Sequence, residues 1–414
     1  MILGTRYIGT FRVPLWKKGM NKPVVSLASC KNYSPEELKT ALLKIFFNLG
    51  GIEKYVTAGV KIVLKPNLIM AKSPSECATT NPEFIRQLAI ILKEYGAQLF
   101  IAESPGGPYT SARLKAVYNA CGITEVAAET GIEVNYKTET VKKENPDGRF
   151  LKILELIKPL ADADFIINLP KAKSHGQMTY TGAVKNMFGA VAGMFKVDYH
   201  MRMSEYDTFA DAIIDVFLSV KPKLNIMDAV MGMEGNGPTN GNPRHIGLIC
   251  ASEDAFALDL AMLGILDLDP RKVPVMKQGM LRNLCANDVS EIEIKGENPG
   301  DFLIDDFLFP TESAISFFHS NFLLKPFERF FKPYPHFLLD SCTSCGECMR
   351  VCPAKTIIIK DRKPYADLKK CVRCFCCQEL CPAAAVEIRR SFVHKIFSTI
   401  YEALLKLYNL GSRP

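Results

Sequence analysis

Short runs of apolar residues alternate with longer amphipathic stretches through the first two thirds of the chain. Apolar runs this short are typical of strands buried on both faces of a parallel sheet. The stretches between them begin at capping residues such as Ser34, Asn81 and Asp254, and we expect them to be helices. The predicted strands are residues 24–28, 60–64, 99–102, 165–168, 224–228 and 246–250, and the predicted helices are residues 34–49, 81–95, 110–121, 181–194, 207–220 and 252–266. The pattern predicts an α/β domain whose mostly parallel sheet is flanked by helices.

Size and composition indicate a globular chain with more than one domain. Its 414 residues exceed what one compact core usually holds, and 48% hydrophobic with 23% charged residues excludes a disordered or fibrous chain. No apolar run approaches the roughly 18 uncharged residues of a membrane helix, so no transmembrane segment is expected. The net charge of +7 is too mild to indicate nucleic-acid binding.

Cysteines are concentrated near the C-terminus, where nine of the 14 lie between Cys342 and Cys381. They include two copies of the spacing C-x2-C-x2-C-x3-C, each followed by proline. In bacterial ferredoxins with this spacing, three cysteines of each copy bind one cluster and the fourth binds the other cluster. We therefore predict two 4Fe–4S clusters. Cluster 1 takes Cys342, Cys345, Cys348 and Cys381, and cluster 2 takes Cys371, Cys374, Cys377 and Cys352.

Other cysteine chemistry explains this pattern less well. A zinc site needs four ligands, usually as two C-x2-C pairs, and disulfides need an oxidising compartment that nothing in the sequence implies. Cys376 lies inside the second copy but out of register. It could exchange with Cys377 as a ligand or be a buried thiol beside the cluster. The five cysteines outside this region are scattered, as expected for small core residues of a reduced, cytoplasmic protein.

Residues 339–390 closely resemble bacterial-type 2×4Fe–4S ferredoxin domains. Between the two cysteine motifs, residues 354–359 and 363–365 predict a short hairpin. From Asp340 to Arg390 the segment has ten basic and six acidic residues. This positive excess predicts an acidic redox partner protein, although the same charges could simply form a solvated face.

Polar side chains follow four of the predicted strands. In an open α/β sheet the carboxyl ends of parallel strands meet at one edge, where ligands bind. We expect a shared site for an anionic small molecule at this edge, formed by these side chains together with a nearby asparagine. The predicted substrate-binding residues are Lys65, Asn67, Glu103, Lys171, Lys173, Asn186 and Asp228.

Residues 168–200 carry the densest group of unusual side chains. Lys185 interrupts a small, apolar predicted helix, where a lysine is costly unless it is paired or faces a ligand. The alternative is that it extends along the surface to reach water. His175 follows two lysines, and histidine in its ordinary state titrates near neutral pH, as a proton donor should. We predict His175 and Lys185 as catalytic residues.

A loop rich in glycine and asparagine is predicted over residues 232–242. Backbone of this kind can approach a phosphate or carboxylate closely, or the loop could be a flexible cover for the strand ends. The loop matches neither the P-loop nor the dinucleotide-binding fingerprint.

The order and spacing of these motifs resemble the domain-of-unknown-function 362 family. The resemblance covers about residues 22–300. It is carried by Leu64-Lys65-Pro66-Asn67, Glu103-Ser104-Pro105-Gly106-Gly107, residues 173–186 and the 232–242 loop. Members of this family often carry a C-terminal ferredoxin module, so the resemblance implies this architecture and an iron–sulfur redox role. It implies no particular reaction or substrate.

The sequence predicts further segments outside the two domains. Residues 310–338 contain seven phenylalanines, which we expect to pack against both domains or to dock a partner. Residues 391–414 predict an amphipathic helix that packs on the core, with membrane-surface association as the alternative. The predicted division is an N-terminal extension (1–21, with Met20 as a second possible start), an α/β domain (22–309), an aromatic linker (310–338), a ferredoxin domain (339–390) and a C-terminal helix (391–414).

Two functions fit these features. The first is a ferredoxin-coupled oxidoreductase, in which the clusters pass single electrons to an anionic small molecule held by lysines of the α/β domain. The second is a non-catalytic electron carrier, or the cluster-bearing subunit of a redox complex, whose large domain only docks a partner. The strand-end side chains favour the first.

Overall fold

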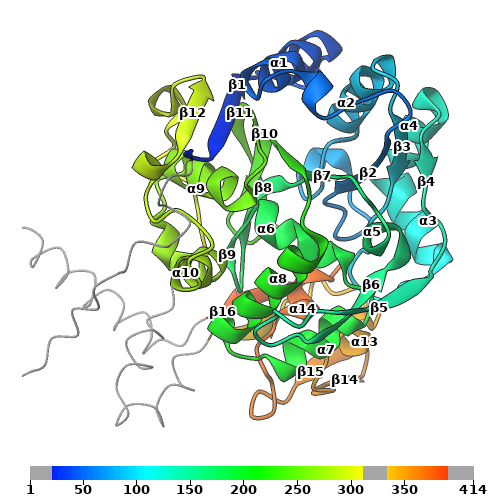
Figure 1. Cartoon of the computed structure of the whole chain (residues 1–414). Helices are drawn as coiled ribbons and strands as arrows, with labels where there is room; N and C mark the ends of the chain where they lie inside the picture. Colours follow the sequence, from blue (N-terminus) through cyan, green and yellow to red (C-terminus); the bar gives the residue numbers. More distant parts are fainter. Residues whose placement is uncertain (1–20, 311–332, 390–414) are drawn as a thin grey trace, which may run out of the picture.

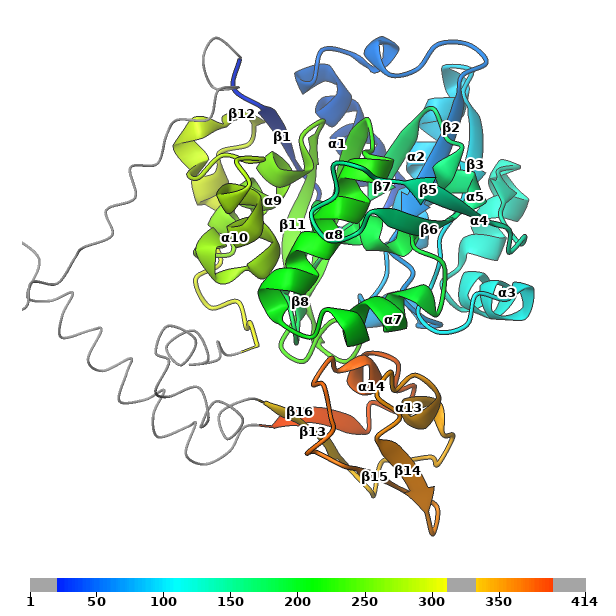
Figure 2. The same ribbon diagram turned by 60° about the horizontal axis from the view of Figure 1, so that its bottom comes forward.

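The computed structural model describes residues 21–310 and 333–389. They form a large α/β domain and a small cysteine-rich lobe that lies against one end of it (Figure 1, Figure 2). The predicted C-terminal helix and nearly all of the N-terminal extension and the aromatic linker lie outside the described residues.

Ten strands in the described residues form one mixed, mostly parallel sheet. They are β1 (Val24–Ser29), β2 (Lys61–Pro66), β3 (Gln98–Ile101), β4 (Glu133–Val134), β7 (Ile166–Leu169), β8 (Lys171–His175), β9 (Thr179–Thr181), β10 (Leu224–Glu234), β11 (Asn242–Ser252) and β12 (Glu293–Gly296). The order is β12-β1-β11-β10-β7-β2-β3-β4, and β8 pairs with β10 and β9. Only β11 and β9 run against their neighbours. The predicted fold class is confirmed, and the carboxyl ends of β2, β3, β7 and β8 meet at one edge.

Helices cover both faces of this sheet (Figure 1). Neighbouring side chains of β10 enter two separate cores, Ile226 on one face and Met227 on the other. The first core includes α1 (Pro35–Asn48), α2 (Pro82–Glu94), α3 (Ser111–Ala120) and α4 (Ile123–Thr130), and the second includes α6 (Ala183–Asn186), α8 (Tyr206–Val220), α9 (Ala255–Ile265) and α10 (Pro274–Leu281). The side chains of Ser34, Asn81 and Asp254 cap α1, α2 and α9, as predicted.

Smaller elements complete the α/β domain. Strands β5 (Thr140–Glu144) and β6 (Ile153–Ile157) form an antiparallel pair of their own. Helix α5 (Lys158–Ala161) follows this pair, and α7 (Phe195–Arg202) lies between α6 and α8 in the chain. Neither the β5–β6 pair nor α5 nor α7 was predicted from the sequence. Helix α7 nevertheless forms part of the candidate site.

The predicted helix over residues 181–194 is wrong in length. The structure has α6 followed by a single 3₁₀ turn, Met187–Ala190. The Asp259 carboxylate accepts hydrogen bonds from the N–H groups of Ala183 and Val184, at 2.6 and 3.1 Å, which holds the start of α6 against α9. At the other end, a Cβ on Gly189 would lie 2.1 Å from Glu103 Oε1. Contacts with these buried carboxylates hold the segment where a longer regular helix would not fit.

The predicted loop over residues 232–242 is shorter in the structure. The antiparallel hairpin of β10 and β11 extends through Gly232 and Met233, which pair with Arg244 and Pro243. Only residues 235–241 form the turn at its tip, because glycine in a strand weakens pairing without preventing it.

The cysteine-rich lobe is built from two strand pairs and two short helices. Strand β14 (Ile357–Lys360) pairs with β15 (Lys363–Ala366), which is the predicted hairpin. Strand β13 (Tyr334–Phe337) pairs with β16 (Val386–Arg389), so residues assigned to the linker belong to this lobe. Helices α13 (Glu347–Arg350) and α14 (Cys376–Glu379) carry the cysteine motifs. In Figure 2, α14 faces the α/β domain and the β14–β15 hairpin lies on the far side.

Candidate active site

The cysteines of the two motifs form two groups within the small lobe. Cys342, Cys345, Cys348 and Cys381 line one cavity. In the second group, Cys371 interacts electrostatically with Cys374 and Cys352, and Cys377 interacts with these three and also with Cys348 of the first group. The ligand pairing taken from the spacing stays a prediction.

Backbone N–H groups point at cysteine sulfurs in both motifs. Hydrogen bonds of this kind favour the thiolate form and tune the potential of an iron–sulfur cluster. The N–H groups of Ser344, Thr356 and Arg373 lie 3.4 Å from the Sγ atoms of Cys342, Cys352 and Cys371, and that of Ala385 lies 3.2 Å from Cys381 Sγ. The residues present fit 4Fe–4S binding.

The two motifs differ in burial. Cys345 of the first motif is exposed, whereas Cys374, Cys377 and Cys381 of the second motif are buried. Helix α14, which contains Cys377, lies against the α/β domain. We call the group of Cys342, Cys345, Cys348 and Cys381 the outer cysteines and the group of Cys371, Cys374, Cys377 and Cys352 the inner cysteines.

The tip of the β10–β11 hairpin holds α14 in place. Thr239 Oγ1 donates to the carbonyl of Glu379 at 2.9 Å, and Asn240 Nδ2 donates to the carbonyl of Gln378 at 3.2 Å. Gln378 Nε2 in turn donates to the Asn236 carbonyl at 3.0 Å. The glycine- and asparagine-rich turn thus binds the last carbonyls of a helix.

Two glycines of the α/β domain allow the small lobe to approach closely. A Cβ on Gly106 would lie 2.5 Å from Leu380 Cδ2, and a Cβ on Gly176 would lie 2.3 Å from Ile388 Cδ1. A side chain at either position would displace an apolar side chain of the lobe. The absence of a side chain at these two glycines therefore allows the lobe to pack closely against this end of the sheet.

A pocket of about 90 Å³ lies between the two domains. Its polar and thiol side chains come from the carboxyl edge of the sheet, from α6 and α7, and from α14 of the small lobe. They are Asn67, Glu103, Ser104, Lys173, Thr181, Lys185, Asn186, Lys196, His200, Cys376 and Glu379. Five of the nine residues predicted for the site therefore line one pocket.

The other predicted residues lie outside its lining. Lys171 Nζ forms a buried ion pair with Asp228 at 2.7 Å, so these two side chains satisfy each other. Lys65 Nζ lies 2.5 Å from Glu103 Oε2, so Lys65 contacts a residue of the pocket lining without being part of that lining. Burial lowers the pKa of Lys65 and raises that of Glu103, while their mutual attraction opposes both shifts.

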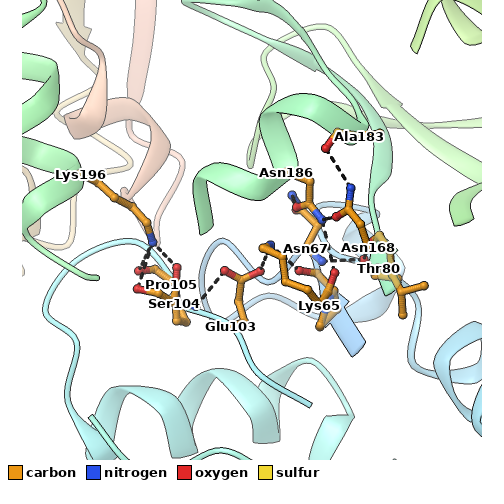
Figure 3. A network of polar contacts seen from close by, with 12 residues as sticks. Lys65, Asn67, Thr80, Glu103, Ser104, Pro105, Asn168, Ala183, Asn186 and Lys196 are labelled. Carbon is orange, nitrogen blue, oxygen red and sulfur yellow. Dashed lines mark hydrogen bonds and ion pairs between the residues drawn. The ribbon is translucent and has the colours of Figure 1, made fainter. Parts of the chain in front are cut away.

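A chain of side-chain amides fixes the floor of the pocket. Lys173 Nζ donates to Asn67 Oδ1, Asn67 Nδ2 donates to Asn186 Oδ1, and each distance is 2.8 Å. Asn186 Nδ2 donates to Asn168 Oδ1, also at 2.8 Å. Figure 3 shows the three asparagines side by side near the Lys65–Glu103 pair. Because each amide is oriented by the next, their donors and acceptors cannot rotate freely.

His175 connects the α/β domain to the small lobe. Its Nδ1 accepts from the N–H groups of Gln177 and Met178, which places the proton of the neutral ring on Nε2. Nε2 lies 3.0 Å from Glu379 Oε1. Burial and the charge of Lys185 lower the pKa of His175 to about 4, so the ring is neutral at pH 7. Although burial opposes it, His175 and Lys185 hold the pKa of the Glu379 carboxyl at about 2.

Helix α7 contributes two pocket residues that were not predicted for the site. Lys196 Nζ donates to the carbonyls of Ser104 and Pro105 (Figure 3), and burial lowers its pKa to about 7. His200 is buried against Phe209 with ring centroids 4.0 Å apart, and burial lowers its pKa to about 4. Lys196 was signalled only by its place in the 168–200 segment, whereas His200 and Asp198 could also be considered for proton transfer from their residue types. Asp198 pairs with Arg202 at the surface.

Glu379 is a pocket residue for which the sequence predicted no role, and Cys376 was considered only as a cluster ligand or a buried thiol. One signal for Glu379 exists: it is an acid where the first motif has Arg350. Nothing in the local pattern of either motif shows that this acid meets His175, which lies about 200 residues earlier in the chain.

Comparison with known proteins agrees with this description. A family model described as a domain of unknown function (DUF362) matches residues 62–264, and a 4Fe–4S dicluster domain matches residues 335–382. A thylakoid-associated protein of Synechocystis sp. is 34% identical over 294 residues, which cover 69% of this chain and 87% of that protein.

Solved structures are only distantly similar. The lactate racemase apoprotein from Thermoanaerobacterium thermosaccharolyticum aligns with a TM-score of 0.35 and 12% identity, over 56% of this chain and 54% of that one. A Thermotoga maritima protein aligns with a TM-score of 0.33 and 12% identity, over 66% and 62%. This chain therefore spans little more than half of the racemase.

The fold and the cysteine motifs define an iron–sulfur protein in which a ferredoxin-like domain is joined to an α/β domain. The chain belongs to the DUF362 family. Residues 21–310 and 333–389 contain no helix that is long and apolar enough to cross a membrane.

Proposed function

We propose that this chain is a ferredoxin-coupled oxidoreductase that acts on a small anionic molecule in the pocket between its two domains. The observation that supports this most strongly is the composition of the pocket wall. Lys173 and Lys185 come from the α/β domain, while Cys376 and Glu379 come from the helix that also carries Cys377. A molecule bound by these lysines would lie directly beside the inner cysteines.

Two 4Fe–4S clusters, one held by the outer and one by the inner cysteines, would carry single electrons between a partner protein and this pocket. The exposure of Cys345 suits electron entry at the outer cysteines, and the burial of Cys374 and Cys377 suits delivery within the protein. The partner would be acidic. One of the six acidic residues of the small lobe, Glu379, is turned inward. Six basic residues of the lobe are exposed: Lys355, Lys360, Arg362, Lys363, Lys369 and Lys370.

Different side chains around the pocket would serve in ligand binding and in proton transfer. Lys185 would bind the anion, because no carboxylate of the described residues lies within ion-pair distance of its Nζ. The reduction of a small organic molecule commonly consumes protons as well. Lys196 can hold or release a proton near pH 7, whereas His175 is neutral there and instead positions Glu379. We therefore propose Lys196, rather than His175, as the proton donor.

The first test is the iron content of the anaerobically purified protein. Two clusters predict about eight iron and eight acid-labile sulfide per chain. Zinc, or about one metal per chain, would contradict the assignment.

The second test separates an oxidoreductase from a carrier. Chemically reduced protein is mixed with the low-mass fraction of a cell extract, and reoxidation is followed by visible absorbance. We expect Lys185→Met to lose the acceleration by small molecules while keeping its iron and its electron transfer to a protein acceptor. Lys39→Met, which removes an exposed lysine of α1, should behave like the wild type. Equal acceleration in all three proteins would favour the carrier.

A further inference from the structure

The β14–β15 hairpin of the small lobe exposes an apolar pair of side chains. Because side chains alternate along a strand, Ile358, Lys360, Lys363 and Tyr365 all lie on one face of this hairpin. Ile358 and Tyr365 are directly opposite each other across the two strands, and they are 60% and 48% exposed. The hairpin lies on the side of the lobe away from the α/β domain (Figure 2), so that domain does not cover the pair.

Basic residues surround this apolar pair. Lys360 and Lys363 are directly opposite each other next to it, although like charges placed in this way repel. Arg362 in the turn is also exposed, and none of these three side chains forms an ion pair within the described residues. The acidic Asp367 is already paired with Lys370, at 3.8 Å. This face is therefore complementary to a surface that carries carboxylates around an apolar patch.

The other face of the hairpin covers the outer cysteines. Ile359 and Pro364 line the same cavity as all four of these cysteines. Ser344 Oγ donates to the carbonyl of Arg362, which joins the first cysteine loop to the turn of the hairpin. A protein bound on the exposed face would thus be separated from the outer cysteines only by the hairpin itself.

The position of the apolar residues favours a protein surface over a lipid surface. A hairpin that inserts into lipid needs apolar residues at its tip, because burying a charge in hydrocarbon is costly. The tip of this hairpin is Asp361 and Arg362. Ile358 and Tyr365 instead lie along one face with charged residues around them. Protein interfaces have this arrangement, with aromatic residues at the centre and polar residues at the rim.

We infer that the exposed face of the β14–β15 hairpin is the docking surface for a redox protein with carboxylates around an apolar patch. Ile358 and Tyr365 form the apolar centre of this surface, and Lys360, Arg362 and Lys363 form its basic rim. The inference rests on the proposed function and specifies where and how its acidic partner binds. The interface is expected to be small and transient, as is typical of electron-transfer complexes.

The test uses flavodoxin, a small acidic flavoprotein, as the electron donor. Its hydroquinone is mixed anaerobically with the oxidised, full-length protein; one electron passes to a cluster, and the flavin semiquinone that forms is followed by visible absorbance. Tyr365→Thr keeps a residue suited to a strand and should slow this reaction at least about tenfold. Reduction by dithionite, which needs no docking surface, should be unchanged. Leu303→Thr, at an exposed apolar residue of the α/β domain, should behave like the wild type.

Charge reversal tests the basic rim. Lys360→Glu combined with Lys363→Glu keeps a like-charged pair across the strands, so the hairpin itself should be no less stable. Reduction by flavodoxin should slow about tenfold or more at low ionic strength, and the difference should shrink as salt is added. Lys39→Glu combined with Lys115→Glu makes the same change of net charge on exposed positions of α1 and α3, and it should slow the reaction far less. All variants should keep the iron content of the wild type.

Several outcomes would overturn the inference. One is that flavodoxin fails to reduce a wild type that dithionite does reduce. Another is that Tyr365→Thr lowers the stability but not the flavodoxin rate, which would mean that the apolar pair serves only the hairpin. A third is that Tyr365→Thr loses binding to vesicles of phosphatidylcholine and phosphatidylserine, or loses self-association, while the flavodoxin rate stays the same. The face would then belong to a lipid surface or to a second copy of the chain.

Failure of this inference and failure of the proposed function can be told apart. A protein that takes electrons through this face but passes none to small molecules would overturn the oxidoreductase and leave the docking surface standing. A protein that reduces small molecules, with a flavodoxin rate that no hairpin variant changes, would overturn the docking surface alone.

Discussion

The two cysteine motifs have identical spacing but lie in different surroundings. Each cysteine of the first motif has its counterpart 29 residues later, and the left-handed residues Ser344 and Gly346 correspond to Arg373 and Phe375. Left-handed backbone is rare for a bulky residue such as Phe375, so the conformation is imposed by the loop that the cysteine spacing requires. The backbone of the two motifs is thus the same.

The positions that differ are those between the cysteines. Where the first motif has Glu347, Met349, Arg350 and Val351, the second has Cys376, Gln378, Glu379 and Leu380. The four residues of the second motif all contact the α/β domain or its pocket. On the proposed assignment, the cysteine spacing sets where the clusters would bind, and the residues between the cysteines determine what each cluster would face.

Removing one inner cysteine should have the largest effect. Cys377→Ser should lose about half of the iron, because one cluster loses a ligand. Cys376→Ser, one residue away, should keep about eight iron per chain, because Cys376 falls outside the C-x2-C-x2-C-x3-C spacing, even though its thiol contacts Cys374 and lines the pocket. Iron and sulfide analysis of both variants decides between them. Loss of iron in Cys376→Ser alone would mean that the two cysteines exchange roles.

Exchanging the charges at positions 350 and 379 should destabilise the protein strongly at position 379 and only weakly at position 350. Glu379→Arg places a cation beside Lys185 and Lys173 and leaves His175 without its partner, which should destabilise the protein by about 3–5 kcal/mol. The reciprocal change, Arg350→Glu, removes a surface ion pair with Glu347 and should change the stability by less than about 1 kcal/mol. Chemical denaturation of both variants measures the difference. Similar losses would mean that the two motifs are equally embedded.

The pocket side of the molecule should be sensitive to acid. The pKa values of His175 and His200 are both lowered from 6.5 to about 4 in the folded protein, so the unfolded chain binds more protons between these values. Stability should be complete above about pH 6.5 and fall towards pH 4, by up to about 3 kcal/mol for each histidine. His200→Gln should flatten the dependence of the melting temperature on pH, and the exposed His245→Gln should not. An unchanged profile in His200→Gln would show that folding does not lower the pKa of His200.

The glycine contacts of the lobe should show the smallest effect. Gly106→Ala brings a Cβ to 2.5 Å from Leu380 Cδ2, and displacing that flexible side chain should cost about 1–3 kcal/mol. Gly300→Ala meets only ordinary contacts and serves as the control. Thermal unfolding compares the two, and adding Leu380→Ala to Gly106→Ala should restore part of the loss. No restoration would mean that the glycine serves another purpose.

Local signals account for what the sequence predicted. The cysteine spacing, the caps at Ser34 and Asn81 and the short apolar strands each depend on neighbours in the chain, so the elements and the fold class could be predicted. Lys185 could be singled out because a lysine in an apolar helix is costly wherever it lies.

The remaining site residues depend on contacts between distant segments. Lys171 and Asp228 resembled binding residues as single side chains, and only the fold brings them together as an ion pair. Glu379 meets His175 only because the small lobe docks on the carboxyl edge of the sheet. The pKa of His175 depends on the same docking, so the ordinary value for histidine could not indicate its protonation.

The central claim is that the two clusters are unequal, one facing a partner and the other facing the pocket at Lys185. The most direct test is an anaerobic redox titration of the wild type and Lys185→Met, with each cluster followed by its EPR signal. Removing a positive charge beside the inner cysteines should lower the reduction potential of one cluster and leave the other unchanged. An equal shift of both potentials, or no shift of either, would contradict the account.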